Sequence, residues 1–326
     1  MLGVVALLLL SCISMSGNQN RTSVKEVAAG IYMIDTMMSD RAGYTSVFLV
    51  RGDKAALLDS GVSVTAGNVL EGIKKSGTSL HDIGYIALTH AHYDHAGGAH
   101  KLVQMLKEAG NTSAKVACAK KPQVYLSRAD ICEKLMRSGK ITEGELAGDM
   151  EPVSEDDFLV LEDGDLMDLG GLSVKAIDSP GHANGHLVFL VPEREFLFVG
   201  DACGLLVRDP DGAPRVLPTS FAPEYRHDTY IRTVRDIIEL APSMVGFAHF
   251  GVVADPVPVL ETAVRDADNI RGISRKLSAG EIEKSEAMDA LEEEYGPALK
   301  SLYGDPCRCR VTIKALLSGM LNDLSR

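Results

Sequence analysis

The sequence predicts an α+β protein in which two mixed β-sheets pack face to face and helices cover their outer faces. Two observations support this fold class. Short apolar runs of β character recur between turn residues, and helical segments separate these runs in an order that is used twice along the chain. The 326 residues are enough for one large domain with an appendage.

The first half of the chain begins with strand-like runs that are bounded by Gly, Asp or Arg. Gly52-Asp53 predicts a hairpin turn between two of these runs. Helical segments follow, and the second of them starts at Gly97-Gly98. The strands are expected at 30–35, 44–50, 54–59, 85–89 and 115–119, and the helices at about 64–75 and 98–108.

Residues 128–157 are polar and acidic, contain several glycines and show little strand character. We interpret them as an insertion with one or two short helices, and a lid is one possible role for it. Strands resume after this segment, and a helix at about 227–240 precedes the last of them. These later strands are expected at 158–161, 173–177, 186–191, 196–199 and 244–248.

The last third of the chain has a helical pattern. Asp255-Pro256 is typical of a helix start, and Ser278-Ala279-Gly280 interrupts the apolar spacing that follows it. Two more helices are expected, at about 281–295 and 311–325. These helices are expected to pack on the main domain, and they could instead shape a substrate entrance or a homodimer interface. We divide the chain into an N-terminal extension (1–23), a main domain (24–255) and a helical region (256–326).

Composition argues against a nucleic-acid partner. The formal net charge is −12, and no cluster of Lys and Arg stands out. Proteins that bind phosphate backbones normally carry a basic balance or a basic stripe. The six cysteines match no zinc-finger spacing, so we expect reduced thiols, as is usual in a reducing compartment.

The N-terminal extension leaves the location of the protein open between two interpretations. Residues 2–10 are apolar, and Ser11-Cys12 follows them, as in a short export segment with a lipid-attachment cysteine. However, no Lys or Arg precedes the apolar run, and Met15 offers a later start. We expect a cytoplasmic protein, with export or lipid anchoring through Cys12 as the alternative.

The chemistry of the chain is concentrated in residues 89–98, whose sequence is T-H-A-H-Y-D-H-A-G-G. Three histidines and one aspartate lie within six residues, directly after a buried strand. Histidine is the commonest metal ligand in proteins. In an extended segment His90 and His92 point to the same side, and Asp94 and His95 follow where the chain begins to turn. The pattern therefore predicts a metal site at this strand end.

This motif resembles the signature of the metallo-β-lactamase superfamily, and it is most similar to the glyoxalase II-like branch. The later motifs of that superfamily are also present in order. They are S-P-G-H at 179–182, V-G-D at 199–201 and A-H-F-G at 248–251. The resemblance covers roughly residues 25–255 and implies a four-layer αββα sandwich with the helical region appended.

The resemblance implies a binuclear metal centre, most simply of zinc, with iron or manganese as other options. By this resemblance, Asp59 would hold a ligating histidine through its free ring N–H, and Asp94 would also handle protons. His186 is expected to support the site or to pack against a strand, and His81, His100 and His227 are expected on the surface. The implied ligands are His90, His92 and His182 for one metal, Asp94, His95 and His249 for the other, and Asp201 between them.

Such a site implies hydrolysis of a small acyl substrate. A water shared by two divalent cations becomes a hydroxide near neutral pH and attacks a polarised carbonyl. Thioesters, lactones and related esters are the expected substrates. The main alternative is a persulfide dioxygenase of the same fold. By resemblance to those enzymes, His90, His182 and Asp201 would hold a single iron. A phosphodiester hydrolase, or a binding protein that has lost activity, is less well supported by this ligand set.

Overall fold

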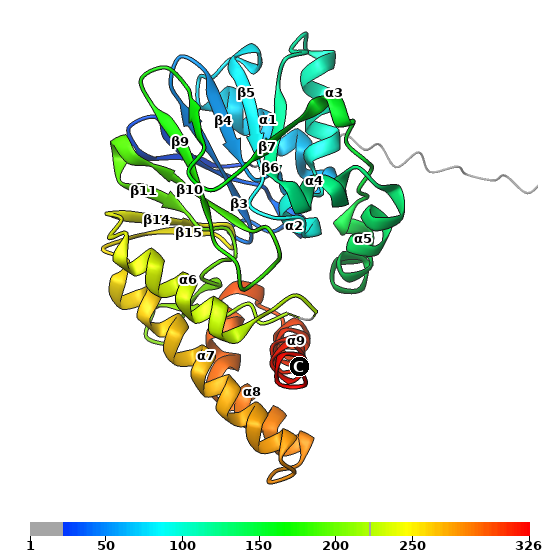
Figure 1. Cartoon of the computed structure of the whole chain (residues 1–326), viewed down its shortest axis with the longest axis vertical. Helices are drawn as coiled ribbons and strands as arrows, with labels where there is room; N and C mark the ends of the chain where they lie inside the picture. The colour runs from blue at the N-terminus through cyan, green and yellow to red at the C-terminus, as the bar shows by residue number, and fades with distance from the viewer. Residues whose placement is uncertain (1–21, 222) are drawn as a thin grey trace, which may run out of the picture.

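The computed structural model of the chain describes residues 22–221 and 223–326 (Figure 1). The apolar run at 2–10 and Cys12 lie outside the described residues. None of the described helices is both long enough and apolar enough to cross a bilayer. The described cysteines are free thiols.

The first sheet holds the N-terminal strands in sequence order. Its first four strands are antiparallel, whereas the pairs from β4 onward are parallel. Parallel neighbours end at the same edge of a sheet, so the segments that follow β4 and β5 lie side by side. The strands are β1 (Val24–Ala28), β2 (Ile31–Asp35), β3 (Ser46–Arg51), β4 (Ala55–Leu58), β5 (Ile83–Ala87), β6 (Lys115–Ala119) and β7 (Phe158–Leu161).

The second sheet has the order β15-β14-β11-β10-β9-β8. Its pairs are antiparallel except for β11 and β14, which are parallel and so end at the same edge. The strands are β8 (Leu166–Asp168), β9 (Ser173–Asp178), β10 (Leu187–Val191), β11 (Phe196–Phe198), β14 (Met244–Phe247) and β15 (Gly251–Ala254).

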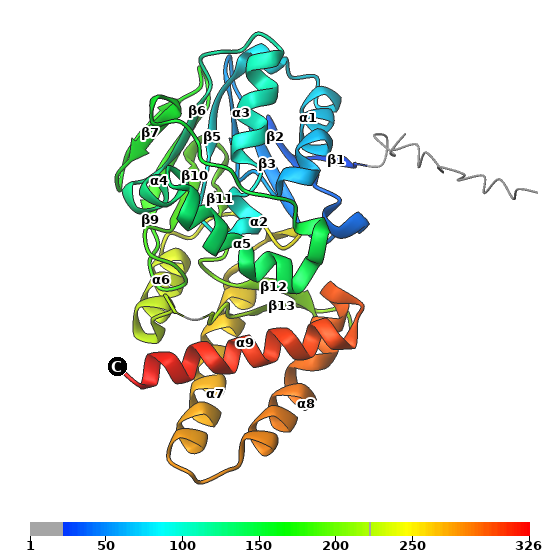
Figure 2. The ribbon, with the colours of Figure 1, turned by 90° about the vertical axis from the view of Figure 1, so that its right-hand side faces the viewer.

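The two sheets face each other across an apolar layer that includes Phe48, Phe189 and Phe198, all fully buried. Helices α1 (Ala66–Lys75) and α3 (Ala99–Glu108) cover the outer face of the first sheet, and α6 (His227–Glu239) covers that of the second (Figures 1 and 2). Apolar side chains repeat at helical spacing in these helices, so each buries one face against its sheet. The architecture is the expected four-layer αββα sandwich.

Three further parts surround one end of this sandwich. The insertion forms α5 (Ala129–Glu143), which α4 (Lys120–Leu126) precedes. A separate hairpin of β12 (Leu205–Arg208) and β13 (Pro214–Leu217) lies between β11 and β14 in the chain. The C-terminal region folds into α7 (Val257–Ser278), α8 (Lys284–Tyr303) and α9 (Pro306–Leu324). Helix α9 crosses below α2 (Tyr93–Ala96) and α5 (Figure 2).

The expected elements are present, and several shorter ones were not expected. The chain forms β1, β8, β12, β13, β15 and α4 in addition, and α9 begins at Pro306, five residues before the expected start at 311. One surface expectation is wrong. His227 is buried, because its ring lies between the Tyr225 hydroxyl and the Asp268 carboxylate, at 3.3 and 3.0 Å.

Candidate metal centre

The predicted metal ligands gather at one edge of the sandwich, because strands from both sheets end there. His90 follows β5, and Asp201 and His249 follow the parallel strands β11 and β14. His182 lies in the loop between β9 and β10. Two backbone hydrogen bonds join the sheets at this edge, from Leu187 N to Thr89 O at 2.8 Å and from Ser46 N to Ala248 O at 2.7 Å.

The segment after β5 turns sharply into α2, which carries both Asp94 and His95, and then into α3. Helix α2 is a single turn, and α3 starts directly after Gly97-Gly98. Gly98 has an ordinary helical backbone, with φ of −82°. Glycine is needed here because the backbone passes close to Ser60, and a Cβ atom on residue 98 would lie 2.5 Å from the Ser60 carbonyl oxygen. The glycines thus press this turn against the end of β4.

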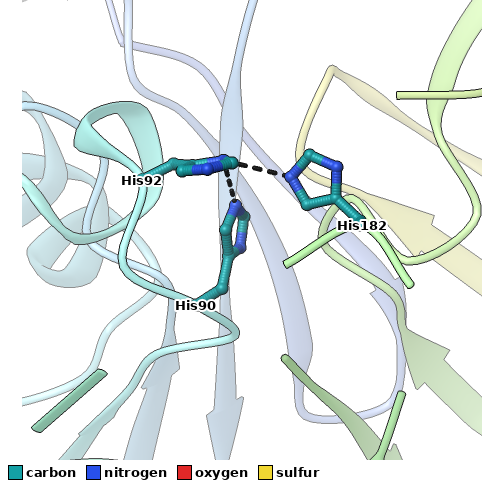
Figure 3. A group of neighbouring side chains, drawn as sticks. All are labelled: His90, His92 and His182. Atoms are coloured by element: carbon teal, nitrogen blue, oxygen red, sulfur yellow. Dashed lines mark hydrogen bonds between the residues drawn. The ribbon is translucent and has the colours of Figure 1, made fainter. Parts of the chain in front are cut away.

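Three histidine side chains converge on one point from two loops (Figure 3). His92 Nδ1 lies 2.9 Å from His90 Nε2 and 3.0 Å from His182 Nε2. His90 and His182 are 0 and 1% exposed. This cluster can hold a metal ion, because its ring nitrogens all lie within 4.8 Å of one another.

In His90 and His182, the ring nitrogen that faces away from the cluster makes a hydrogen bond, and this bond fixes which nitrogen carries the proton. His182 Nδ1 donates to the carbonyl oxygen of Thr219 at 2.8 Å, so its Nε2 carries a lone pair. The hydroxyl of Thr89 donates to Asp59, so His90 Nδ1 donates to that hydroxyl and its Nε2 also carries a lone pair. Two lone pairs therefore point at His92 Nδ1, which can hold only one proton. A metal ion satisfies all three nitrogens, so this cluster fits a cation.

A second cluster lies beside the first and contains Asp94, His95 and His249. His95 Nε2 lies 3.8 Å from Asp94 Oδ2, and His249 Nε2 lies 3.6 Å from the same oxygen. Among the described residues, His95 Nε2 is one of the few buried polar atoms that have no hydrogen-bond partner. A buried unpaired nitrogen is costly unless something binds it, so this cluster also fits a cation.

Asp201 lies between the two clusters. Its Oδ2 is 3.6 Å from His182 Nε2, on the side of the first cluster. Its Oδ1 is 3.4 Å from both His95 Nε2 and His249 Nε2, on the side of the second, and makes no hydrogen bond. The carboxylate thus presents one oxygen to each cluster, which is the arrangement that a bridging ligand requires.

The protonation states differ between the clusters. Burial, together with the neighbouring His182 ring, lowers the pKa of His92 to about 4. Burial and the His95 ring lower the pKa of His90 well below its usual value, so these rings are neutral and free to bind a cation. Burial also acts to lower the pKa of His95, but Asp201 and the other carboxylates outweigh it and hold that pKa well above its usual value. The second cluster therefore attracts positive charge.

Asp59 supports the second cluster from behind. Its Oδ2 accepts a hydrogen bond from His95 Nδ1 at 2.8 Å, and its Oδ1 accepts one from Thr89 N at 2.8 Å. Asp59 can reach both because it ends β4 beside the parallel β5. When a cation displaces the second proton of the ring, this bond keeps the remaining proton of His95 on Nδ1 and leaves the lone pair of Nε2 facing the site.

Some supporting groups were not anticipated from the sequence. Thr89 bridges Asp59 and His90, and its position directly before His90 is the only signal in the sequence. Thr219 holds His182 through a backbone carbonyl, for which no sequence signal exists. His186 donates from Nδ1 to the Ser179 hydroxyl and accepts from Asp201 N, so it supports the Asp201 loop as expected.

A pocket of about 690 Å³ opens from the two clusters toward solvent. His92, Asp94, Asp201 and His249 form part of its lining. The remaining lining comes mainly from α5 and α9, and aromatic rings such as Phe221 are included. This volume is typical of a site for a small organic ligand.

The comparison with known families decides the identity of the fold. A sequence model of the metallo-beta-lactamase superfamily matches residues 40–249. This chain belongs to that superfamily. The matched range contains all seven converging side chains, and the fold expected from the motifs is confirmed.

One relative, ST1585, is similar to this chain both in sequence and in its solved structure. The metallo-beta-lactamase fold-containing protein ST1585 of Sulfurisphaera tokodaii is 31% identical over 217 residues, which are 65% of this chain and 75% of ST1585. Its crystal structure aligns with a TM-score of 0.59 at 28% identity and covers 85% of this chain and 99% of ST1585. That match is longer than residues 1–255, so it extends into the C-terminal helices.

Two thioesterases are more distant relatives. The human acyl-coenzyme A thioesterase MBLAC2 is 23% identical over 231 residues, which are 66% of this chain and 75% of the relative. The atrochrysone carboxyl ACP thioesterase nsrC of Aspergillus novofumigatus is 22% identical over 282 residues, which are 86% of this chain and 66% of the relative.

Proposed function

We propose that this protein is a two-metal hydrolase that cleaves acyl thioesters, with lactones and related esters as chemically similar substrates. The main observation behind this proposal is the position of Asp201, whose two carboxylate oxygens face two separate clusters of His and Asp side chains. The first cluster would be held together by a cation on His90, His92 and His182, and the second by one on Asp94, His95 and His249.

Two divalent cations at these positions would supply a water that is deprotonated near neutral pH and would polarise the carbonyl of the substrate. In the reaction, the water oxygen adds to the carbonyl carbon, the carbon–sulfur bond breaks, and the products are a carboxylic acid and a thiol. The proton that the water loses must reach the departing sulfur.

Asp94 is the carboxylate best placed to carry that proton. It lines the pocket, its side chain is 15% exposed, and that of Asp201 is 3% exposed. A carboxylate that borders both the water position and the substrate pocket can accept a proton from one and give it to the other. Asp94 thus has the candidate metal ligands on one side and the open pocket on the other.

Thioesters are favoured over other acyl substrates by the relatives of the chain. Two of the matched proteins are thioesterases by name, one an acyl-coenzyme A thioesterase and the other an atrochrysone carboxyl ACP thioesterase. Both are below 25% identity, so they support the reaction type and leave the acyl group to be derived from the pocket.

The test is the release of free thiol from acyl-N-acetylcysteamine thioesters by untagged protein loaded with zinc. We expect zinc-dependent release that follows saturation kinetics, and a loss of at least about 10³-fold in Asp201→Ala, because that variant removes the group between the two clusters. Glu108→Gln, an exposed change on α3, is the matched control and should keep full activity. Equal rates in wild type and Asp201→Ala would refute the proposed reaction.

A further inference from the structure

Two helices that supply no metal ligand form facing walls of the substrate pocket. Helix α5 comes from the insertion and α9 from the C-terminal region, and they lie one above the other beside α2 (Figure 2). Side chains of both helices line the same pocket as His92 and Asp94. The space between them is therefore continuous with the metal centre.

The wall that α9 contributes is long, and apart from Arg308 it has no large side chain. Cys307, Val311, Ala315 and Ser318 line the pocket, and their spacing places them on one face of the helix. At a rise of 1.5 Å per residue, this face extends over about 16 Å. A groove of this length suits a linear chain better than a compact ring.

Two of the side chains that line the groove are large, apolar and exposed to solvent. Ile141 on α5 is 82% exposed, Val311 on α9 is 44% exposed, and both line the pocket. Exposed apolar side chains that gather around a pocket typically mark a site for an apolar ligand. An acyl chain lying between the two helices would cover both of them.

The charges of the groove are unsuited to an acidic acyl group. Among the described residues that line it, Arg308 is the only lysine or arginine. Arg308 Nη1 lies 2.9 Å from Oε2 and 3.1 Å from Oε1 of Glu143, so its charge is already paired. Asp305 adds a further carboxylate to the lining. A carboxylate on the substrate would find no free cation in the groove.

The same ion pair joins the two helices near the N-terminal end of α9. Glu143 is the last residue of α5, and Arg308 lies in the first turn of α9. Glu143 is buried and also accepts a hydrogen bond from the Tyr44 hydroxyl at 3.0 Å. A chain whose carbonyl lies at the metal centre can extend along α9 toward Ala315 and Ser318, which line the same pocket.

We propose that the groove between α5 and α9 binds the acyl part of the substrate, and that this acyl part is a linear, uncharged chain of medium length. This inference rests on the proposed thioester hydrolysis, because it places the carbonyl at the metal centre and the chain along α9. Short acyl groups and acyl groups with a terminal carboxylate are then poor substrates.

The experiment compares kcat/KM for acetyl, octanoyl and decanoyl thioesters of N-acetylcysteamine, and for the octanoyl analogue with a terminal carboxylate. We expect decanoyl to exceed acetyl, and the carboxylate analogue to be at least about tenfold slower than octanoyl. Ser318→Phe fills the groove and should lower the decanoyl-to-acetyl ratio by about tenfold or more. Lys314→Phe, on the same helix but outside the pocket, should leave that ratio unchanged.

Binding of decanamide, measured by isothermal titration calorimetry on the zinc-loaded protein, separates the groove from the reaction. Decanamide binding that Ser318→Phe weakens supports the groove even if no thioester is cleaved, and in that case only the proposed reaction fails. Thioester cleavage with equal acetyl and decanoyl rates, insensitive to Ser318→Phe, overturns the groove and leaves the reaction standing. An absence of decanamide binding also overturns the groove.

Discussion

At the scale of single residues, the site depends on protons that are placed by groups behind the ligands. His95 and His182 each donate their outer N–H, to Asp59 and to the Thr219 carbonyl, so the inner nitrogens carry lone pairs. The sequence could predict the candidate ligands, since H-x-H-x-D-H is contiguous and the others follow strands. It could not predict Thr219, because any residue supplies a backbone carbonyl.

Asp59→Asn tests the role of the supporting carboxylate. If the amide oxygen accepts from Thr89 N, the amide N–H group faces His95 Nδ1 and forces the proton of that ring onto Nε2. We expect the affinity for zinc at the second cluster to fall about 10- to 100-fold. Competition against a chromophoric chelator measures this change. Asp130→Asn, at an exposed position, is the control, and equal affinities in the two variants would contradict the assignment.

At the scale of elements, the strands with continuous apolar runs were predicted, whereas the edge strands β1, β8 and β15 were not. The burial of β1 and β8 is incomplete, because each lies at the edge of its sheet and has polar residues facing solvent. Short strands of this kind carry little periodic signal. The start of α9 is marked in the sequence by Asp305-Pro306, a capping pair in which Asp305 accepts a hydrogen bond from Cys307 N at 2.9 Å.

Two helical glycines provide a matched test of how the elements pack. A Cβ atom on Gly72, in α1, would lie 2.3 Å from the buried side chain of Ile34 in β2, whereas one on Gly272, in α7, would meet nothing within 4 Å. We expect Gly72→Ala to lower the free energy of unfolding by about 1–3 kcal/mol. Gly272→Ala should raise it by about 0.5–1 kcal/mol. Urea unfolding of the zinc-loaded protein measures both, and the same sign for both would contradict the packing.

At the scale of the whole molecule, the fold brings together segments that are far apart in the chain. The metal centre uses residues from 90 to 249, and the pocket adds α5 and α9. The sandwich could be predicted, because its strands and motifs follow a recognisable order. The pocket could not, since residues such as Ile141 and Val311 belong to no motif and meet only when α9 folds back across the site.

The central claim is that Asp201 lies between two metal ions, and metal content per chain tests it most directly. Elemental analysis of untagged protein, purified without chelators, should find two divalent ions per chain, most simply zinc. Asp201→Ala should bind fewer ions, because it removes an oxygen from each cluster. One iron per chain would contradict the two-metal account and favour the persulfide dioxygenase, with oxygen uptake as the next measurement. No bound metal would contradict both.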